Sequence, residues 1–321
     1  MPHVPFTLSR PRRALAVGAL ACAGLSLAGP AVASAAQRPQ HHHHAAAATS
    51  SAPMPSVKGG YGVRPKLTFP NTKPSGSLEV KVLHQGNGPV VRNPDLIVCN
   101  YYGQVWRGKV FDTSFGRGLF PTPIGVGAVI PGWDKGLVGV HAGSRVLLVI
   151  PPGEAYGKAG QPSAGIPKNA TLAFVIDVVA VYNHTAHGDV HATVLHKTVK
   201  GVTVSGKLGH VPTIKIAPKT PEPKGVSVTV LDRGNGPKLK PGVLVDQYVA
   251  ESWQNTVSGS TYTQGFPDGE TIPAGAGTSA LSGLVGVPLG SRVLIELPKS
   301  SNGGPFAIVM DLVAQPHEPK G

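Results

Sequence analysis

The sequence predicts an α+β fold, in which a curved antiparallel sheet packs on one short helix, and it predicts this fold twice. Glycine (42) and proline (32) are abundant, whereas only 14% of the 321 residues are charged. Such a composition favours many short strands and turns over long surface helices. Runs of β-branched and aromatic residues are separated by turn-forming pairs, and several of these runs recur at a constant offset. A chain of this length accommodates two domains.

Four runs rich in β-branched and aromatic residues predict the strands of the first copy: 78–83, 96–106, 145–150 and 171–181. Turn signals separate them at Asn87-Gly88, Arg107-Gly108 and Pro152-Gly153. Tyr101-Tyr102-Gly103 is expected to end the second of these strands. Phe111 then follows a turn, and Arg117 and Phe120 lie in the loop after it.

A short helix is predicted after Pro131-Gly132, and Trp133 opens it. Asp134 falls in its first turn, where the helix dipole favours a negative charge. Trp133, Leu137, Val138 and Val140 share one face at helical spacing. A buried tryptophan keeps its N–H near a partner or at the edge of a pocket. On this stretch alone, a core tryptophan on a helix packed against a sheet is the favoured interpretation.

The two copies are related by an offset of 147 residues over most of their length. The matched segments are 57–69 with 204–216, 83–89 with 231–237, 136–140 with 283–287, and 143–147 with 290–294. We therefore predict one domain at 57–182 and another at 204–316, each with an N-terminal arm. A flexible linker at 183–203 joins them, and residues 317–321 form a tail. The histidines of the linker are interpreted as polar linker residues rather than as metal ligands.

The N-terminus has the pattern of an export signal, which we assign to residues 1–36. Arg10, Arg12 and Arg13 precede an apolar run at 14–29 and small residues suited to cleavage. A lipoprotein anchor at Cys22 is the less favoured alternative. Residues 37–56 form a low-complexity spacer, in which four histidines are more simply solvated than metal-binding.

Once the signal is removed, Cys99 is the only cysteine, and its apolar surroundings in sequence predict a small buried residue. The net charge of +13 lies mainly outside the compact parts of the two copies. Residues 77–182 carry nine basic against six acidic residues, and residues 225–316 carry five against seven. This distribution favours weak contact with anionic envelope polymers over nucleic-acid binding.

A series of motifs in the first copy carries a family resemblance. In order these are Tyr101-Tyr102-Gly103, Phe111-Asp112-Thr113-Ser114, Val129-Ile130-Pro131-Gly132-Trp133, Pro152-Gly153-Glu154-Ala155-Tyr156-Gly157 and Ile166-Pro167 leading into Ala170–Phe174. The series resembles the FKBP-type peptidyl-prolyl cis-trans isomerases over about 77–182, and over 225–316 in framework only. The resemblance implies two half-barrels, each an antiparallel sheet wrapped around one short helix, with an aromatic pocket between sheet and helix.

The resemblance also assigns roles to eleven residues. Trp133 resembles the pocket floor, and the walls are Tyr101, Phe111, Phe120 and Phe174. Val129 and Ile130 resemble the rim, with the Ile130 N–H holding the peptide, and Ile166 resembles part of a flap. Tyr156 resembles a hydroxyl donor to the substrate. Asp112, expected to be buried beside Tyr101 and Arg117, resembles the polar wall that faces the amide. Taken singly, each apolar residue also fits a core position, Tyr156 a loop anchor, and Asp112 a structural pair with Arg117.

Some positions depart from the family pattern. Gln161 stands where histidine is usual and Thr122 where an aromatic residue is common, and both departures bear on specificity. In the second copy Tyr248 matches Tyr101, but Ala280 replaces Trp133 and Ile308 replaces Phe174. Tyr262-Thr263 is interpreted as the replacement of Phe111-Asp112. The segment 298–305 is too short to hold a counterpart of the loop that carries Tyr156. The second copy is therefore predicted to fold alike without catalysing isomerisation. Trp253, Tyr262 and Phe266 either form an altered groove or are scattered over the surface.

The resulting hypothesis is an exported isomerase that accelerates X–Pro rotation in unfolded proteins, active in the first copy and monomeric. Its partners are proline-containing peptides and unfolded chains, and the resemblance adds macrolide inhibitors of the family as ligands. No metal or cofactor is expected, because rotation about an amide needs none. The rival hypothesis is a non-catalytic chaperone or a proline-rich-peptide-binding protein of the envelope.

Overall fold

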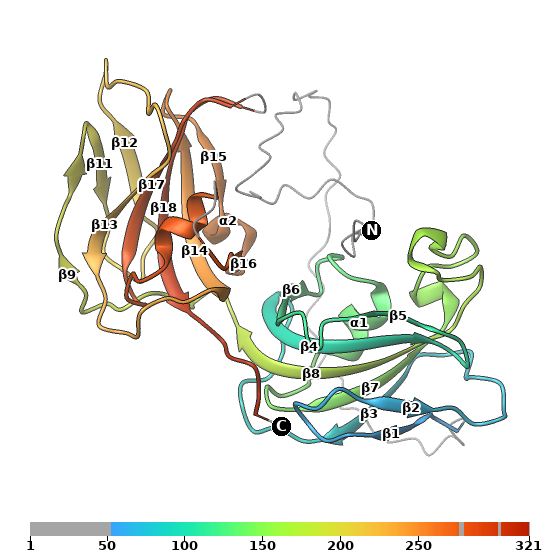
Figure 1. Ribbon diagram of the computed structural model, residues 1–321. Coiled ribbons are helices and arrows are strands. Elements are labelled where there is room, and N and C mark those ends of the chain that lie inside the picture. Colours follow the sequence, from blue (N-terminus) through green and yellow to red (C-terminus); the bar gives the residue numbers. More distant parts are fainter. Residues whose placement is uncertain (1–52, 276–278, 301–302, 321) are drawn as a thin grey trace, which may run out of the picture.

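The computed structural model describes residues 53–275, 279–300 and 303–320, and most of them belong to antiparallel sheets (Figure 1). The predicted signal peptide, Cys22 and residues 37–52 of the spacer lie outside the described residues. Helices are few and short. Among the described residues, none is long and apolar enough to cross a membrane.

The first large sheet holds six antiparallel strands. Its order is β3 (Glu79–His84), β7 (Arg145–Ile150), β8 (Leu172–Tyr182), β4 (Asp95–Val105) and β5 (Val110–Thr113), with β6 (Phe120–Ile124) also paired to β4. The four predicted strands agree with the structure to within a residue or so. Two expectations were wrong: Tyr101 lies in the middle of β4 rather than at its end, and Phe120 begins β6 rather than lying in a loop.

The short helix α1 (Pro131–Gly136) lies against β7. A Cβ on Gly132 would come within 2.4 Å of Ile150 Cγ2, so glycine lets the helix approach the sheet this closely. Trp133 and Leu137 are buried as predicted. Because the helix ends at Gly136, Val138 leaves the expected apolar face and is 46% exposed. Two 3-10 turns, η1 (Pro152–Glu154) and η2 (Pro162–Ala164), lie between β7 and β8.

The second large sheet has the same order of strands. It runs β15 (Val257–Ser260), β14 (Gly242–Ser252), β18 (Phe306–Ala314), β17 (Arg292–Leu297), β13 (Ser227–Arg233) and β9 (Thr193–Val194), with β16 (Asp268–Ile272) also on β14. The 3-10 turn η3 (Ala280–Leu284) precedes β17, as α1 precedes β7. The sequence did not predict α2 (Thr261–Gln264), which begins at a Ser260 cap and ends at Gly265.

An arm packs on one face of each large sheet. The first arm pairs β1 (Ser56–Lys58) with β2 (Lys66–Thr68), and the second pairs β10 (Thr198–Val199), β11 (Val202–Ser205) and β12 (Thr213–Ile216). The buried Arg145 binds Asp177 at 2.5 and 2.7 Å and donates to the carbonyls of Gly59 and Val63. Arg292 binds Asp311 and two carbonyls of the second arm in the same way. Each buried ion pair thus fixes an arm to its sheet.

Residues 183–203 differ from the flexible linker that the sequence predicts. They contain β9 and β10 and the start of β11, and β9 extends the second sheet by pairing with β13. The two large sheets also touch through Leu96, Val98, Val243 and Val245, which form one buried apolar cluster. Figure 1 shows this arrangement, with the first sheet in blue to green and the second in yellow to red.

Candidate active site

Aromatic rings gather around Trp133 on the helix-facing side of the first sheet. The Trp133 ring lies 5.6 Å from Tyr101 of β4, 5.3 Å from Phe174 of β8 and 6.5 Å from Phe120 of β6, centroid to centroid. Phe111 of β5 reaches the cluster through Phe174 at 5.4 Å. Every pair meets edge to face, the geometry that the ring quadrupoles favour. The five predicted floor and wall residues therefore come together, although they derive from five elements.

Gly103 makes this approach of the rings possible. It lies in β4 two residues after Tyr101, on the same face of the strand. A Cβ at Gly103 would lie 2.6 Å from Phe111 Cζ and 2.8 Å from Phe174 Cε1. Any side chain here would push the two rings apart. Gly103 belongs to the motif Tyr101-Tyr102-Gly103, but nothing in the sequence indicated this role.

Two N–H groups beside the rings have no partner among the described residues. The indole Nε1 of Trp133 is buried and makes no hydrogen bond there. The Ile130 amide likewise donates to none of them, while its carbonyl accepts from Trp133 N at 2.9 Å. A buried donor left unsatisfied is costly. Both groups are thus suited to a carbonyl or ring supplied by a ligand.

Asp112 forms a compact polar group at the edge of the rings. Its Oδ2 accepts from the Tyr101 hydroxyl at 2.5 Å, and its Oδ1 accepts from Thr113 N at 2.8 Å and from the Arg117 guanidinium. Arg117 is exposed and Asp112 half-buried, so the predicted group forms at the surface of the cluster rather than deep inside. Burial, followed by the hydrogen bond to Asp112, raises the pKa of Tyr101 far above its ordinary 10. The Tyr101 hydroxyl therefore stays protonated at neutral pH.

The loop with Tyr156 and Ile166 covers one end of the cluster. Tyr156 is half-buried against the core, and burial together with the charge of Asp112 raises the pKa of its hydroxyl well above 10. Ile166 is 1% exposed and exchanges two backbone hydrogen bonds with Gln161, at 2.9 and 3.0 Å. An ion pair between Lys135 and Glu154 at 3.0 Å joins α1 to the start of this loop.

The segment before α1 is held by Asp134. Its two carboxylate oxygens accept from Gly125 N at 2.7 Å and Gly127 N at 3.0 Å. Both glycines have positive φ (85° and 71°), a conformation that L side chains rarely adopt. From its place in the sequence Asp134 was expected only to interact with the helix dipole, and no local signal indicated this anchoring. The side chains of Val129 and Ile130, expected at the rim, are instead 7% and 0% exposed.

The corresponding place in the second sheet lacks the aromatic side chains. Ile308 pairs with Ile295 across β18 and β17, as Phe174 pairs with Leu148 across β8 and β7, so Ile308 takes the place of Phe174. Ala280 begins η3. The expected match of Tyr262-Thr263 to Phe111-Asp112 was wrong. Thr261 Oγ1 accepts from Tyr248 N as Ser114 Oγ accepts from Tyr101 N, so register makes Ser258 and Gly259 the counterparts.

Tyr262 and Trp253 are directed away from that place. The Tyr262 hydroxyl donates to Asp311 at 3.0 Å, and Trp253 Nε1 donates to the Thr220 carbonyl at 3.0 Å. Trp253 packs with the second arm rather than with the η3 side of the sheet. The suggested groove of Trp253, Tyr262 and Phe266 is therefore not formed by these side chains.

Cys99 is fully buried, as predicted, and burial raises the pKa of its thiol above the ordinary range. Within the part of the chain that the structure describes, no group of three or more His, Cys, Asp or Glu side chains is placed to share a metal ion.

The first sheet and α1 thus enclose a binding site that is lined by aromatic rings and carries a few fixed hydrogen-bonding groups. Residues 88–179 match the family model of the FKBP-type peptidyl-prolyl cis-trans isomerases. The chain is 38% identical over 120 residues to the FK506-binding protein of Streptomyces anulatus, and the match covers 37% of this chain and 97% of that protein. The chain therefore belongs to the FKBP-type peptidyl-prolyl cis-trans isomerase family.

Other relatives are longer than the shared region. The isomerase FkpA of Escherichia coli K12 is 43% identical over 107 residues, which are 33% of this chain and 38% of that protein. The chain thus spans less than half the length of this relative. The crystal structure of AtFKBP13 is 36% identical, covers 32% of this chain and 91% of that chain, and has a TM-score of 0.30.

Proposed function

We propose that the first half of the chain catalyses cis-trans isomerisation of X–Pro bonds, with Trp133 at the centre of the site. The observation that carries this proposal is the set of rings around Trp133, together with the unpartnered N–H groups of Trp133 and Ile130. Membership of the isomerase family supports the same reaction.

The reaction needs a suitable environment rather than a nucleophile. Rotation about the amide faces a barrier of about 18–20 kcal/mol, because resonance is lost on twisting. Water stabilises the charge-separated planar amide. A ring-lined site that replaces this water, and places dipoles for the twisted form, stabilises the transition state more than the ground state. Lowering the barrier by about 7 kcal/mol would accelerate rotation roughly 10⁵-fold.

The residues then take the following parts. The proline ring would lie against Trp133, between the rings of Phe111, Phe120, Phe174 and Tyr101. The Ile130 N–H and the Tyr156 hydroxyl would each donate to a peptide carbonyl. Asp112, held by Tyr101 and Arg117, would face the twisting amide, while Val129 and Ile166 would shape the ends of the site.

The second half is proposed to be a non-catalytic copy of the same domain. The shared strand order, the two Arg–Asp pairs and the matching arms support a tandem repeat, with domains at 57–182 and 204–316. Ala280, Ile308, Ser258 and Gly259 occupy the positions of Trp133, Phe174, Phe111 and Asp112. Without the rings, this copy has no comparable place for a proline ring.

The setting of this activity is also a proposal. Residues 1–36 have the pattern of an export signal, so we place the protein outside the cytoplasm or at the cell envelope, as a monomer acting on unfolded exported chains. Weak contact with anionic polymers follows from the basic segments, and moderate salt should release it. One relative is named an FK506-binding protein, which makes a macrolide of that type a proposed ligand of the Trp133 site.

Trp133→Ala and Asp112→Val test the activity in the full-length chain. In a protease-coupled assay with a proline peptide, Trp133→Ala should lower kcat/KM roughly 10- to 100-fold, because it removes several ring contacts worth about 0.5–1.5 kcal/mol each. Val138→Ala, exposed beside the same helix, is the matched control and should leave the rate unchanged. Equal rates in wild type and both site variants would overturn the isomerase proposal. Peptide binding without turnover would favour the chaperone alternative.

A further inference from the structure

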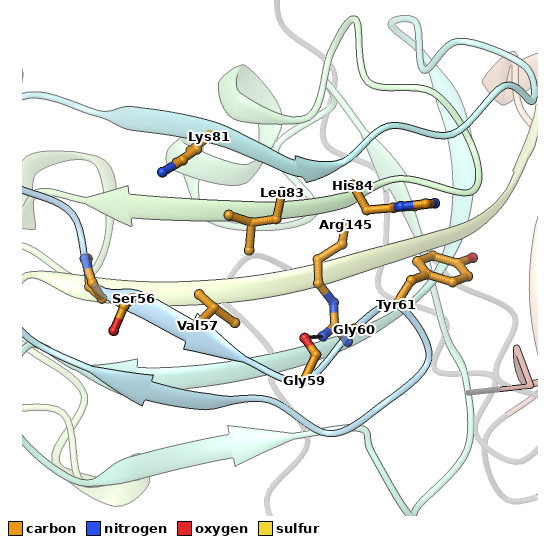
Figure 2. A pocket seen from close by; sticks show the side chains of 10 residues that line it. Ser56, Val57, Gly59, Gly60, Tyr61, Lys81, Leu83, His84 and Arg145 are labelled. Atoms are coloured by element: carbon orange, nitrogen blue, oxygen red, sulfur yellow. Dashed lines mark hydrogen bonds between the residues drawn. The ribbon is translucent and has the colours of Figure 1, made fainter.

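A second candidate binding site lies on the arm side of the first sheet, away from the rings. A cavity of about 430 Å³ opens between β1 of the arm and the edge strand β3. Figure 2 shows Ser56 and Val57 on one side, Lys81, Leu83 and His84 on the other, and Arg145 between them. In the part of the chain that is described, no strand pairs with the outer edge of β3.

The second half shows what fits at this place. There β9 pairs with β13, and the amides of Leu195 and His196 both donate to the Leu231 carbonyl, at 2.8 and 3.1 Å. A few residues on, the Lys197 carbonyl accepts from Val204 N at 2.9 Å, and β10 pairs with β11. Residues 193–199 thus act as an added strand, in which β9 pairs with the sheet edge and β10 pairs with the arm.

The register of the two sheets makes the positions equivalent. His84 faces Arg145 across β3 and β7, as Asp232 faces Arg292 across β13 and β17. Leu83 therefore corresponds to Leu231, one residue before each of these pairs. Leu231 is 1% exposed and packs with Val202 and Val204 of the second arm, whereas Leu83 is 36% exposed. The first sheet presents the same edge, with its apolar residue uncovered.

The charges of the two sites are reversed. Asp232 and Thr229 in the second half correspond to His84 and Lys81 in the first. Burial raises the pKa of the Asp232 carboxyl, while the positive charges of Arg292 and Lys197 oppose this shift, so the added strand brings a cation to an acidic edge. Lys81 and His84 form no ion pair with any described residue. An occupant of the first site should therefore carry an acidic residue where the internal strand carries Lys197.

We propose that the groove between β1 and β3 binds an extended acidic segment of another protein as an added antiparallel strand. One apolar side chain of that segment covers Leu83, and a carboxylate lies near Lys81 and His84. An exposed sheet edge supplies backbone hydrogen bonds, and the neighbouring side chains give specificity. This groove, which is separate from the Trp133 site, would hold an unfolded chain that need not contain proline.

The chain's own N-terminal segment is a poor occupant. By the 147-residue offset, Ala46, Ala47 and Ala48 stand where the second half has Thr193, Val194 and Leu195. Alanine has low β propensity, whereas threonine and valine favour strands. The same segment offers no acidic residue to the basic edge.

Two labelled peptides, neither containing proline, test the proposal on the full-length chain. One copies residues 190–199, and the other is the same peptide with Lys197→Glu. By fluorescence anisotropy the Glu peptide should bind more tightly, by about two- to fivefold, which is the size of effect that an exposed charge pair supplies. The double variant His84→Asp/Lys81→Thr should reverse that preference, and Lys109→Asp, an exposed charge change on the β4–β5 turn, should not.

Amide chemical shifts of the wild-type chain give an independent measurement, because no substitution that could disturb folding is involved. The Glu peptide should move the amides of 82–85 and Val57 and leave the Trp133 indole in place. Absent binding, equal binding of both peptides, or shifts centred on Trp133 would overturn the proposal. Binding that appears only after Ala47→Pro/Ala48→Pro would also overturn it, because the chain's own segment would then be the occupant.

Discussion

The two large sheets share their backbone plan and differ in the side chains that face the helix. In the first sheet Phe111 and Phe174 meet over Gly103, whereas the second has Ala250 at the position of Gly103 and Ile308 at that of Phe174. The bulge that carries Phe111 in β5 recurs at Ser258 in β15. The strand order and the arm anchors therefore do not depend on the rings. The framework is set by sheet pairing and the buried ion pairs, and the rings are an addition to it.

The largest effect is expected from breaking an arm anchor. Asp177→Ala leaves Arg145 buried and without its carboxylate, and loss of one partner of such a pair costs about 3–5 kcal/mol. Asp311→Ala should do the same to the second half. Hydrogen exchange read separately on β7–β8 and β17–β18 would show each variant loosening its own sheet. Equal loosening of both sheets by either variant would contradict independent anchoring.

The next largest effect is expected at Gly103, which lies against the rings of Phe111 and Phe174. Gly103→Ala places a methyl against Phe111 and Phe174, and overpacking of this kind costs about 1–3 kcal/mol. Isomerase activity should fall roughly tenfold or more, because the rings move apart. The reciprocal Ala250→Gly should cost only about 0.5–1 kcal/mol, the entropic difference within a strand. Thermal unfolding and kcat/KM of both variants measure the contrast, and an unimpaired Gly103→Ala would remove Gly103 from the site.

The arm anchors and Gly103 show how much of the structure could be predicted from the sequence. The strands and the start of α1 were predictable because β-branched runs and Pro-Gly are local signals, and the family resemblance implied the grouping of the five rings. Gly103, Asp134 and the arm role of Arg145 were not, since each acts through contacts with residues distant in sequence. The mistaken match of Tyr262 to Phe111 followed a shared aromatic character, whereas the offset of 147 seen at 136–140 and 143–147 pointed to Ser258 and was the better signal.

An effect of similar size and opposite sign is expected at a register position where the two sheets bury different chemistry. Cys99 in β4 corresponds to Asp246 in β14, whose carboxylate oxygens have no hydrogen-bond partner among the described residues. Burial, then the charge of Asp268, raises the pKa of Asp246 well above 3.8, and the same causes raise that of Glu270 to about 8. Asp246→Ala should stabilise the second half by about 1–3 kcal/mol, the usual cost of an unsatisfied buried group.

The pH dependence of that stabilisation follows from the direction of the shifts. Above about pH 4.5 the unfolded chain releases the two protons that the folded chain retains, so the folded state loses stability as the pH rises toward 8. Asp246→Ala should therefore raise the unfolding temperature more at pH 8 than at pH 4.5. Cys99→Ala is the matched control in the first sheet and should show no such pH dependence. A uniform effect of Asp246→Ala across this range would contradict the raised pKa.

The smallest effect should come from exchanging the residues that define the register. Ser114 and Thr261 accept from Tyr101 N and Tyr248 N at 2.9 and 2.8 Å, so a hydroxyl is all that either position uses. Ser114→Thr keeps that hydroxyl and should change stability by less than about 0.5 kcal/mol, whereas Ser114→Ala leaves a buried donor unpaired and should cost about 1–3 kcal/mol. Chemical denaturation of the two variants distinguishes them. If Ser114→Thr were as damaging as Ser114→Ala, Thr261 would not be its counterpart, and the alignment that removes the rings and Asp112 from the second sheet would have to be redrawn.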